Sequence, residues 1–246
     1  MKTLICAAAL AVAAGAASAS IQGETAQFAG FYTVDYRTGV TTFSDASNST
    51  RATTIYSNTA SAPNFGVSST DLNSTWGDKV TTTGTGGPVT SQQYTLFNSG
   101  TSLGTLLTAT VDLLYFDGGT NAFINGFSGN INFGPGGLAA GFFSIITFTG
   151  LDGLNMNLPT TNIIMTQKVT AKTGLANRLG IASLNPVNIG SSGDEMYIDS
   201  TTIGPAGYYT FANGPAQPGY QIDLVPAPGA LALMGLGGLM ASRRRR

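Results

Sequence analysis

The chain contains no histidine, and its single cysteine, Cys6, lies close to the N-terminus. The lack of histidine excludes a Ser-His-Asp triad, a histidine-ligated zinc site and acid–base catalysis by histidine. The lack of any cysteine after Cys6 excludes a cysteine nucleophile, a thiolate metal site and a disulfide from the rest of the chain. Among the common catalytic arrangements, only a pair of carboxylates remains open to this sequence.

Charged residues are also sparse, with 11 basic and 12 acidic residues in a chain of 246. Five of the basic residues lie at the two ends, so the body carries six basic residues against all 12 acidic ones, a net charge of about −6. Such a body has too few cations to neutralise phosphates, and nucleic-acid binding is not expected. The five terminal basic residues are Lys2, Arg243, Arg244, Arg245 and Arg246.

The N-terminus has the pattern of a secretory signal peptide. A short basic segment precedes an apolar stretch over residues 4–14, which is too short to be a permanent membrane span. Ala17 and Ala19 supply the small residues that a signal peptidase reads, which predicts cleavage before Ser20. Cys6 lies at the start of the apolar stretch rather than at the cleavage point, so lipidation of the chain is not expected. Residues 1–19 are therefore predicted to be removed during export.

The C-terminus carries a second targeting pattern. Residues 229–242 are uncharged and rich in Leu and Met, and the four terminal arginines follow them. A helix of these 14 residues would be about 21 Å long, shorter than the roughly 20 residues of an unstrained bilayer span. Arginine clusters are retained on the cytoplasmic side of a membrane. The pattern predicts a short hydrophobic helix whose transfer is stopped by Arg243, Arg244, Arg245 and Arg246.

The motif Val225-Pro226-Ala227-Pro228, the apolar stretch and the arginines together resemble the PEP-CTERM sorting signal of exported bacterial proteins. Ala227 stands where the usual motif has glutamate. The resemblance covers residues 225–246 and implies recognition by exosortase, a membrane cysteine transpeptidase-like enzyme that removes the tail near the motif. It also implies delivery by the secretion machinery to the cell surface or to an exopolysaccharide matrix, with a transient inner-membrane anchor.

Residues 20–224 have the composition and alternation of a β-rich extracellular domain. Apolar residues keep the odd positions over residues 103–115 and again from 123 to 133, on either side of an Asp-Gly-Gly turn, which predicts a long hairpin. Residues 142–148 are apolar on both faces, as in a central strand, and residues 162–170 and 220–224 predict further strands. The predicted fold class is all-β, an antiparallel β-sandwich or jelly-roll-like domain flanked by the signal peptide and the C-terminal hydrophobic helix.

Residues 38–90 differ from the rest of this domain. They are rich in Ser, Thr and Gly and contain few large apolar side chains. Such a composition buries little surface, so the segment is expected to be partly loop or disordered, interrupted by strands near residues 53–56 and 92–97.

The acidic residues supply the candidates for chemistry, but none of them forms a recognisable catalytic pattern, so no catalytic residue is predicted. Two groups could bind Ca²⁺ in loops, namely Asp117 with Asn121, and Asp194 and Glu195 with Asp199. The sequence favours a simple hairpin turn for the first group and a solvated loop for the second. A carboxylate pair would draw on Asp112, Asp117, Asp152, Asp194, Glu195 and Asp199.

Aromatic residues in Gly-, Pro- or Asn-rich surroundings are candidates for stacking on a sugar, although core packing is the commoner fate of such rings. These residues are Trp76, Tyr208, Tyr209, Phe211 and Tyr220.

Two functions fit the sequence. The first is an exported, non-enzymatic surface or extracellular-matrix protein that exosortase sorts and cleaves and that associates with exopolysaccharide or biofilm. The second is a secreted glycan-active protein, either a lectin-like module or a carboxylate-pair glycan hydrolase. We favour the first, because the sorting segments, the low charge and the missing catalytic residues all agree with it.

Overall fold

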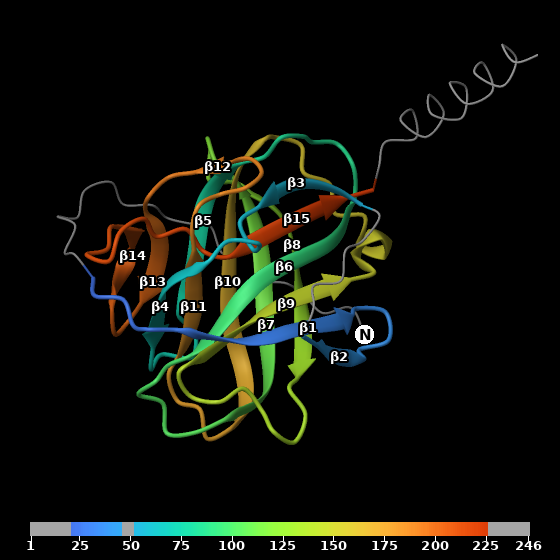
Figure 1. Cartoon of the computed structure of the whole chain (residues 1–246). Helices are drawn as coiled ribbons and strands as arrows, with labels where there is room; N and C mark the ends of the chain where they lie inside the picture. The colour runs from blue at the N-terminus through green and yellow to red at the C-terminus, as the bar shows by residue number, and fades with distance from the viewer. Residues whose placement is uncertain (1–20, 46–51, 226–246) are drawn as a thin grey trace, which may run out of the picture.

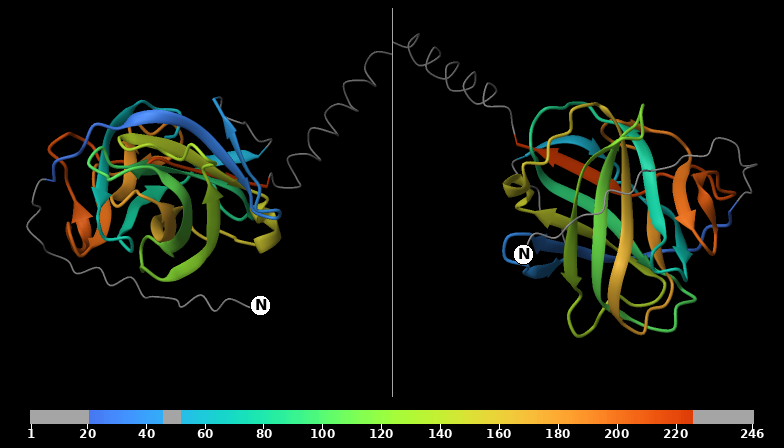
Figure 2. Two further views of the ribbon diagram at one scale, coloured as in Figure 1. Left: turned by 90° about the horizontal axis from the view of Figure 1, so that it is seen from below. Right: turned by 180° about the vertical axis from the view of Figure 1, so that it is seen from behind.

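A computed structural model describes residues 21–45 and 52–225, and this part of the chain is all-β. Two sheets pack face to face with the core between them, so the structure is a β-sandwich (Figures 1 and 2). The strands pair in antiparallel fashion except β1 and β9, which run parallel. A single 3₁₀ turn, η1 (Leu151–Leu154), is the only helical element of the described residues. The predicted β-sandwich class is confirmed.

The eight-stranded sheet follows the order β2-β1-β9-β6-β11-β4, with β15 and β3 branching from β6. It forms the front layer in Figure 1. Its strands are β1 (Gln27–Asp35), β2 (Thr41–Ser44), β3 (Thr53–Ser57), β4 (Pro63–Ser69), β6 (Val89–Asn98), β9 (Phe142–Thr149), β11 (Leu179–Leu184) and β15 (Tyr220–Leu224).

The seven-stranded sheet follows the order β14-β13-β5-β10-β7-β8, with β12 paired to β5. It faces the viewer in the right-hand view of Figure 2. Its strands are β5 (Thr75–Thr81), β7 (Leu106–Asp117), β8 (Phe123–Asn132), β10 (Asn162–Gly174), β12 (Ser191–Ser192), β13 (Met196–Ser200) and β14 (Gly204–Tyr209).

The hairpin β7–β8 forms as the alternation predicts. Ala109, Val111, Leu113 and Tyr115 point into the core from β7, and Phe127 and Ile131 meet them from β8. Leu103, which we expected to extend the strand, is 77% exposed, because β7 begins only at Leu106. The predicted strands over residues 142–148, 162–170 and 220–224 are confirmed as β9, β10 and β15. As expected of a central strand, β9 is buried on both faces between β1 and β6.

Residues 38–90 hold more strand than their composition suggests. β2, β3, β4, β5 and the start of β6 all lie in this range, and β4 and β5 are largely buried. Glycine fits in β4 because a large neighbouring side chain fills the space above it. A Cβ at Gly66, for example, would lie 2.5 Å from the ring of Phe97. The apolar surface that this segment lacks is therefore supplied by other strands.

The eight-stranded sheet forks at β6. Along one edge, the first part of β6 pairs with β15 and the end of β6 pairs with β11. Thr95 lies at the fork, where its Oγ1 donates to the Ala182 carbonyl oxygen at 2.8 Å. Asn58, which is fully buried, joins the branches. Its Nδ2 donates to the carbonyl oxygens of Leu184 and Pro218, at 2.9 and 3.0 Å, and its Oδ1 accepts the backbone N–H of Tyr220 at 2.8 Å.

The described chain enters the fold through a short segment, residues 21–26, that crosses in front of β4 and β11 (Figure 1). Glu24 and Gly66 exchange two backbone hydrogen bonds of 2.7 Å, and the Glu24 carboxylate accepts hydrogen bonds from Ser68 and Ser99. Arg178 lies 3.8 Å from the same carboxylate. The first described residues are therefore bound to the sandwich through both backbone and side-chain contacts.

Two glycines are required by the backbone. Gly30 lies at an irregularity in the β1–β9 pairing with φ +131°, a value that residues with a side chain rarely adopt. Gly180 lies in β11, where an added Cβ would be 1.8 Å from the carbonyl oxygen of Val67. The close approach of β11 to β4 therefore depends on the absence of a side chain at Gly180.

Candidate functional site

A cleft of about 380 Å³ lies toward the β14 end of the seven-stranded sheet. β5 contributes two side chains, the loop between β12 and β13 contributes three residues, and β14 with the residue after it completes the wall. Two backbone carbonyl oxygens of the loop are tied to the segment before β15. The Asp194 oxygen accepts the N–H of Ala216 at 3.1 Å, and the Gly193 oxygen accepts a hydrogen bond from Gln217 Nε2 at 3.4 Å. We call this hollow the acidic cleft, and it is lined by Asp78, Lys79, Gly193, Asp194, Glu195, Tyr208 and Thr210.

Asp78 is the chemically unusual residue of the acidic cleft. The alternation of β5 points Trp76, Asp78 and Val80 inward, and Asp78 is only 1% exposed. Burial raises the pKa of its carboxyl well above the ordinary value, and the hydrogen bond donated by Ser192 opposes this only in part. The native protein therefore holds Asp78 in its protonated form at a pH where an exposed aspartate is ionised.

Tyr208 presents a second unusual group. Its hydroxyl is buried and has no hydrogen-bond partner among the described residues, while the rest of the side chain is half-buried. Burial raises the pKa of Tyr208 to about 12, and the neighbouring carboxyl groups of Asp78 and Glu195 add to the rise. The ring packs edge-on against Tyr197, with 5.6 Å between the ring centroids, which holds it in place. Water, or a ligand group that enters the cleft, can supply the missing hydrogen bond to this hydroxyl.

The mouth of the acidic cleft is formed by exposed charges, with Asp194 and Glu195 on one side and Lys79 on β5. A buried carboxyl that keeps its proton thus shares one hollow with two solvent-exposed carboxylates. Carboxyl groups in different environments have separate protonation states, which is the arrangement that acid–base chemistry uses. The same groups can also donate hydrogen bonds to the hydroxyls of a ligand and accept hydrogen bonds from them.

Of the acidic residues considered from the sequence, only Asp194 and Glu195 belong to this cleft. Asp112 points outward from β7 opposite Ser128, and Asp152 forms an exposed ion pair with Arg37 at 2.6 Å. Asp199 lies further along β13, opposite Thr75 of β5. Asp78 was not among the candidates, although its place between the apolar Trp76 and Val80 in an alternating segment is a signal that an acid faces the core.

The two groups considered for Ca²⁺ are arranged differently. The Asp117 carboxylate accepts the N–H groups of Gly119 and Thr120 at 2.9 and 2.7 Å and the Thr120 hydroxyl at 3.0 Å, and these bonds lower its pKa. Asn121 follows in the left-handed conformation with φ 58°, so Asp117 and Asn121 shape the β7–β8 turn. Asp199 lies apart from Asp194 and Glu195, and no group of three His, Cys, Asp or Glu side chains in residues 21–45 and 52–225 is placed to hold a metal ion.

Four of the five aromatic residues considered for sugar stacking belong to the core. Trp76, Tyr209, Phe211 and Tyr220 are each 7% exposed or less and pack between the sheets. Their Gly- and Pro-rich surroundings mark turns and close approaches of the backbone, not surface platforms. Tyr208 is the only one of the five that is half-buried, and it lines the acidic cleft with its hydroxyl buried.

The residues of the two sorting signals lie almost entirely outside the described part of the chain. Val225 is described. It follows β15, and its backbone N–H donates to the Pro88 carbonyl oxygen at 3.0 Å. Among residues 21–45 and 52–225, no helix is long and apolar enough to cross a membrane. The predicted signal residues outside the described part of the chain are Ala17, Ala19 and Ser20, Pro226, Ala227 and Pro228, and Arg243, Arg244, Arg245 and Arg246.

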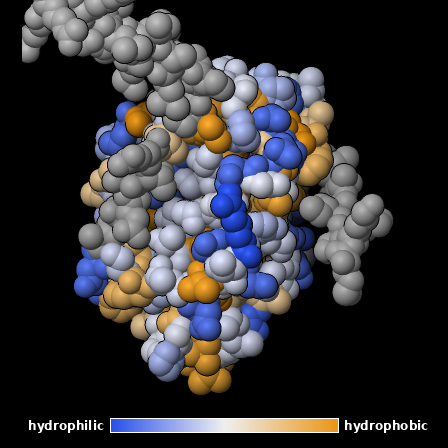
Figure 3. Space-filling model, turned by 90° about the vertical axis from the view of Figure 1, so that its right-hand side faces the viewer, coloured by the Kyte–Doolittle hydropathy of each residue, from blue (hydrophilic) through white to orange (hydrophobic). Residues whose placement is uncertain are grey.

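The surface on the β1–β2 side mixes hydrophilic and hydrophobic residues, and within the described residues the hydrophobic ones form small separate patches on this face (Figure 3).

In comparisons with known proteins, no family model, no curated protein and no solved structure matches this chain.

Proposed function

We propose that this chain is an exported, non-enzymatic β-sandwich protein that is sorted and cleaved at its C-terminal signal and retained at the cell surface among exopolysaccharide. The observation that carries the proposal is the position of the fold relative to the two signals. Ile21, one residue after the predicted signal-peptidase site, already pairs with Phe211, and the last strand ends at Leu224, one residue before the Val225 motif. Removal of both signals would leave all the described strands in place.

The resemblance of residues 225–246 to a PEP-CTERM signal suggests how the protein would reach the cell surface. Exosortase would be the processing partner, and the C-terminal segment would anchor the chain in the inner membrane only until cleavage. The domain would then be held in the matrix by contacts of its own surface. The acidic cleft is the site that we assign to this contact, because its carboxyls and the unpartnered Tyr208 hydroxyl are suited to the hydroxyl groups of a saccharide.

A binding experiment tests the role of the acidic cleft. The exopolysaccharide of the producing cells would be immobilised, and retention of the full chain compared with that of Tyr208→Phe and Glu195→Gln. Asp199→Asn is the matched control, because it removes one exposed carboxylate on the neighbouring β13. We expect both cleft variants to bind less tightly and the control to bind as the wild type does. Equal retention of all four proteins would contradict the assignment of the cleft.

The second candidate function is glycan hydrolysis, and the protonated Asp78 beside Asp194 and Glu195 is the specific observation that favours it. In such a reaction Asp78 would give its proton to the glycosidic oxygen as the carbon–oxygen bond breaks. A mouth carboxylate would act as the base that removes a proton from the attacking water, or as the nucleophile. The products would be two shorter saccharides, one of them with a new reducing end.

An assay of new reducing ends separates the two functions. Hydrolysis predicts that the wild type releases reducing ends from the native exopolysaccharide and that Asp78→Asn and Glu195→Gln both abolish the release. The non-enzymatic function predicts no release by the wild type, together with retention on the polysaccharide. Release that persists in both variants would exclude the acidic cleft as the catalytic centre.

A further inference from the structure

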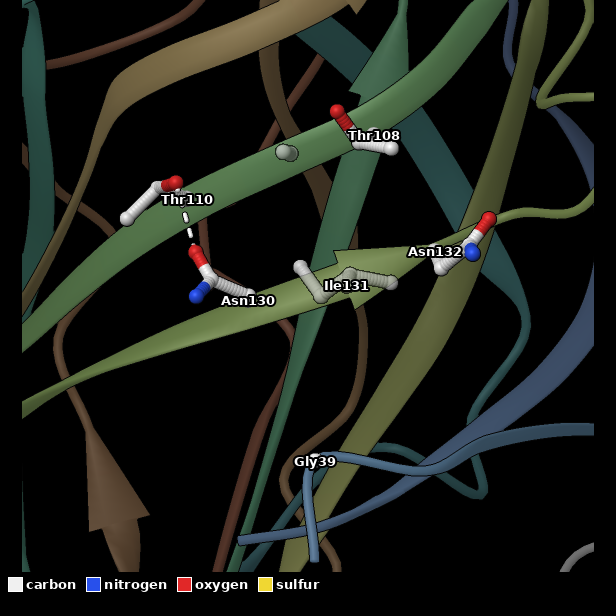
Figure 4. A pocket seen from close by; sticks show the side chains of 7 residues that line it. Gly39, Thr108, Thr110, Asn130, Ile131 and Asn132 are labelled. Atoms are coloured by element: carbon white, nitrogen blue, oxygen red, sulfur yellow. Dashed lines mark hydrogen bonds between the residues drawn. The ribbon is translucent and has the colours of Figure 1, made fainter.

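A second hollow lies at the other end of the seven-stranded sheet, on the outer side of the β7–β8 hairpin. Over residues 109–115 of β7 and 127–131 of β8 the odd positions face the core, so the even positions face outward. Cross-strand register places Thr108 opposite Asn132 and Thr110 opposite Asn130, which gives a two-by-two array of hydroxyls and amides. We call this hollow, of about 250 Å³, the amide groove. It is lined by Gly39, Thr108, Ala109, Thr110, Asn130, Ile131 and Asn132 (Figure 4).

The amide groups of this array are fixed by their oxygens. Thr110 Oγ1 donates to Asn130 Oδ1 at 2.7 Å, and the backbone N–H of Gly134 donates to Asn132 Oδ1 at 2.9 Å (Figure 4 shows the first of these bonds). Neither amide nitrogen forms a hydrogen bond within the described part of the chain. The N–H groups of Asn130 and Asn132 are thus oriented in advance and remain open to a ligand, which lowers the entropy cost of binding.

The rest of the array is also built from hydrogen-bonded pairs. The Thr108 and Thr173 hydroxyls are 2.7 Å apart, which ties β7 to β10, and Thr41 Oγ1 accepts the backbone N–H of Asn132 at 3.2 Å. The second contact joins the start of β2, in the other sheet, to the end of β8. The groove is therefore placed where the edges of the two sheets meet, on rigid strands rather than on a free loop.

The lining contains no charged side chain. A polyanion would find no cation in the groove and a polycation would find no carboxylate, whereas an uncharged polyhydroxyl ligand can use the amide donors and the threonine hydroxyls. The volume lies below the roughly 300–1,000 Å³ of pockets that enclose drug-sized ligands. Such a hollow accommodates a short stretch of a longer polymeric ligand and leaves the rest of that ligand in solvent.

We propose that the amide groove is a saccharide-contact site in its own right, separate from the acidic cleft, and that its ligand is a strand of uncharged polysaccharide. The acidic cleft lies toward β14 and the amide groove at β8, which are opposite ends of the seven-stranded sheet. The inference does not require the acidic cleft to bind anything. If both sites bind, one domain can hold two polysaccharide strands at once.

The test uses calorimetric titration of the full chain, purified in detergent, with cellohexaose as the uncharged probe and with alginate and chitosan hexamers as the anionic and cationic probes. The test variants are Asn130→Asp and Asn132→Asp, which keep the oxygens that Thr110 and Gly134 use and replace the N–H donors with a second, negatively charged oxygen. Asn73→Asp is the control, because Asn73 is an exposed asparagine outside the groove.

We expect cellohexaose to bind in preference to both charged hexamers. Each test variant should weaken its binding about fivefold, since each removes one or two hydrogen-bond donors, and Asn73→Asp should leave it unchanged. The inference would be overturned if the wild type did not bind cellohexaose or bound a charged hexamer more tightly. It would also be overturned if the Asn130→Asp and Asn132→Asp variants bound cellohexaose as tightly as the wild type does. If Glu195→Gln and Tyr208→Phe abolish binding while the groove variants do not, the groove inference fails and the proposed role of the acidic cleft stands.

Discussion

Replacement of Asp78 by asparagine should change how the stability of the protein depends on pH. Asparagine is close in shape to a protonated aspartic acid, and its Oδ1 can still accept the hydrogen bond from Ser192. The variant therefore mimics the protonated native state and cannot ionise in the unfolded state. Comparing the wild type with Asp78→Asn isolates the contribution of this one carboxyl from all other titrating groups.

The sign of the effect follows from the raised pKa of Asp78 in the folded protein. Above about pH 4 the unfolded chain has lost its Asp78 proton while the native state still holds it. The unfolded state then binds fewer protons, so the free energy of unfolding of the wild type falls as the pH rises through this window. The difference in this free energy, variant minus wild type, should grow by about 1.4 kcal/mol per pH unit until the native carboxyl ionises.

Urea unfolding at half-unit steps between pH 4 and 7 measures this difference directly, with Asp199→Asn as the control for losing one exposed negative charge. We expect the Asp78→Asn difference to rise steeply with pH and the wild-type and variant m-values to agree. A difference that is constant with pH, or one that moves in favour of the wild type as the pH rises, would refute the claim that burial keeps Asp78 protonated.

Two further substitutions test the packing of the eight-stranded sheet. Asn58→Ala should lower the free energy of unfolding by about 3–5 kcal/mol, because it leaves several buried backbone groups at the fork without partners. Asn64→Ala is the control, because it removes an exposed amide. We expect it to lower the free energy of unfolding, measured with urea, by about 1 kcal/mol or less. Gly180→Ala should cost about 3 kcal/mol or prevent folding, because its Cβ would overlap the Val67 carbonyl oxygen, whereas Gly153→Ala has open space and should unfold as the wild type does. Similar stabilities within either pair would contradict the packing described for that position.

Much of the fold could be predicted from the sequence where strands are long and their apolar residues alternate. The hairpin β7–β8 and the doubly buried β9 carry this signal in their own residues. β4 could not be predicted in the same way, because the ring of Phe97 covers its Gly66 and its buried serines find hydrogen-bond partners on distant segments. The fork at Asn58 depends on the meeting of segments far apart in the chain, and local patterns carry no information about it.

The candidate site was predicted only in part. Asp194 and Glu195 were noted as an acidic pair, but their partner Asp78 lies on another strand and becomes unusual only through burial. Tyr208 was one of five aromatic candidates, and its four companions are core residues. The chemistry of the acidic cleft arises from three segments brought together by sheet pairing, so no spacing within the sequence reveals it.

The central claim, that the chain is exported, processed and retained in the matrix, is tested most directly by intact mass. The protein would be recovered from the native producer, separately from the membrane and from the extracellular matrix. We predict a matrix form that begins at Ser20 and lacks the residues beyond the motif at 225–228, before any allowance for attached glycan. A protein found only in the membrane fraction that retains Arg246 would contradict the account, because the tail would then be a lasting anchor and the matrix would hold no released domain.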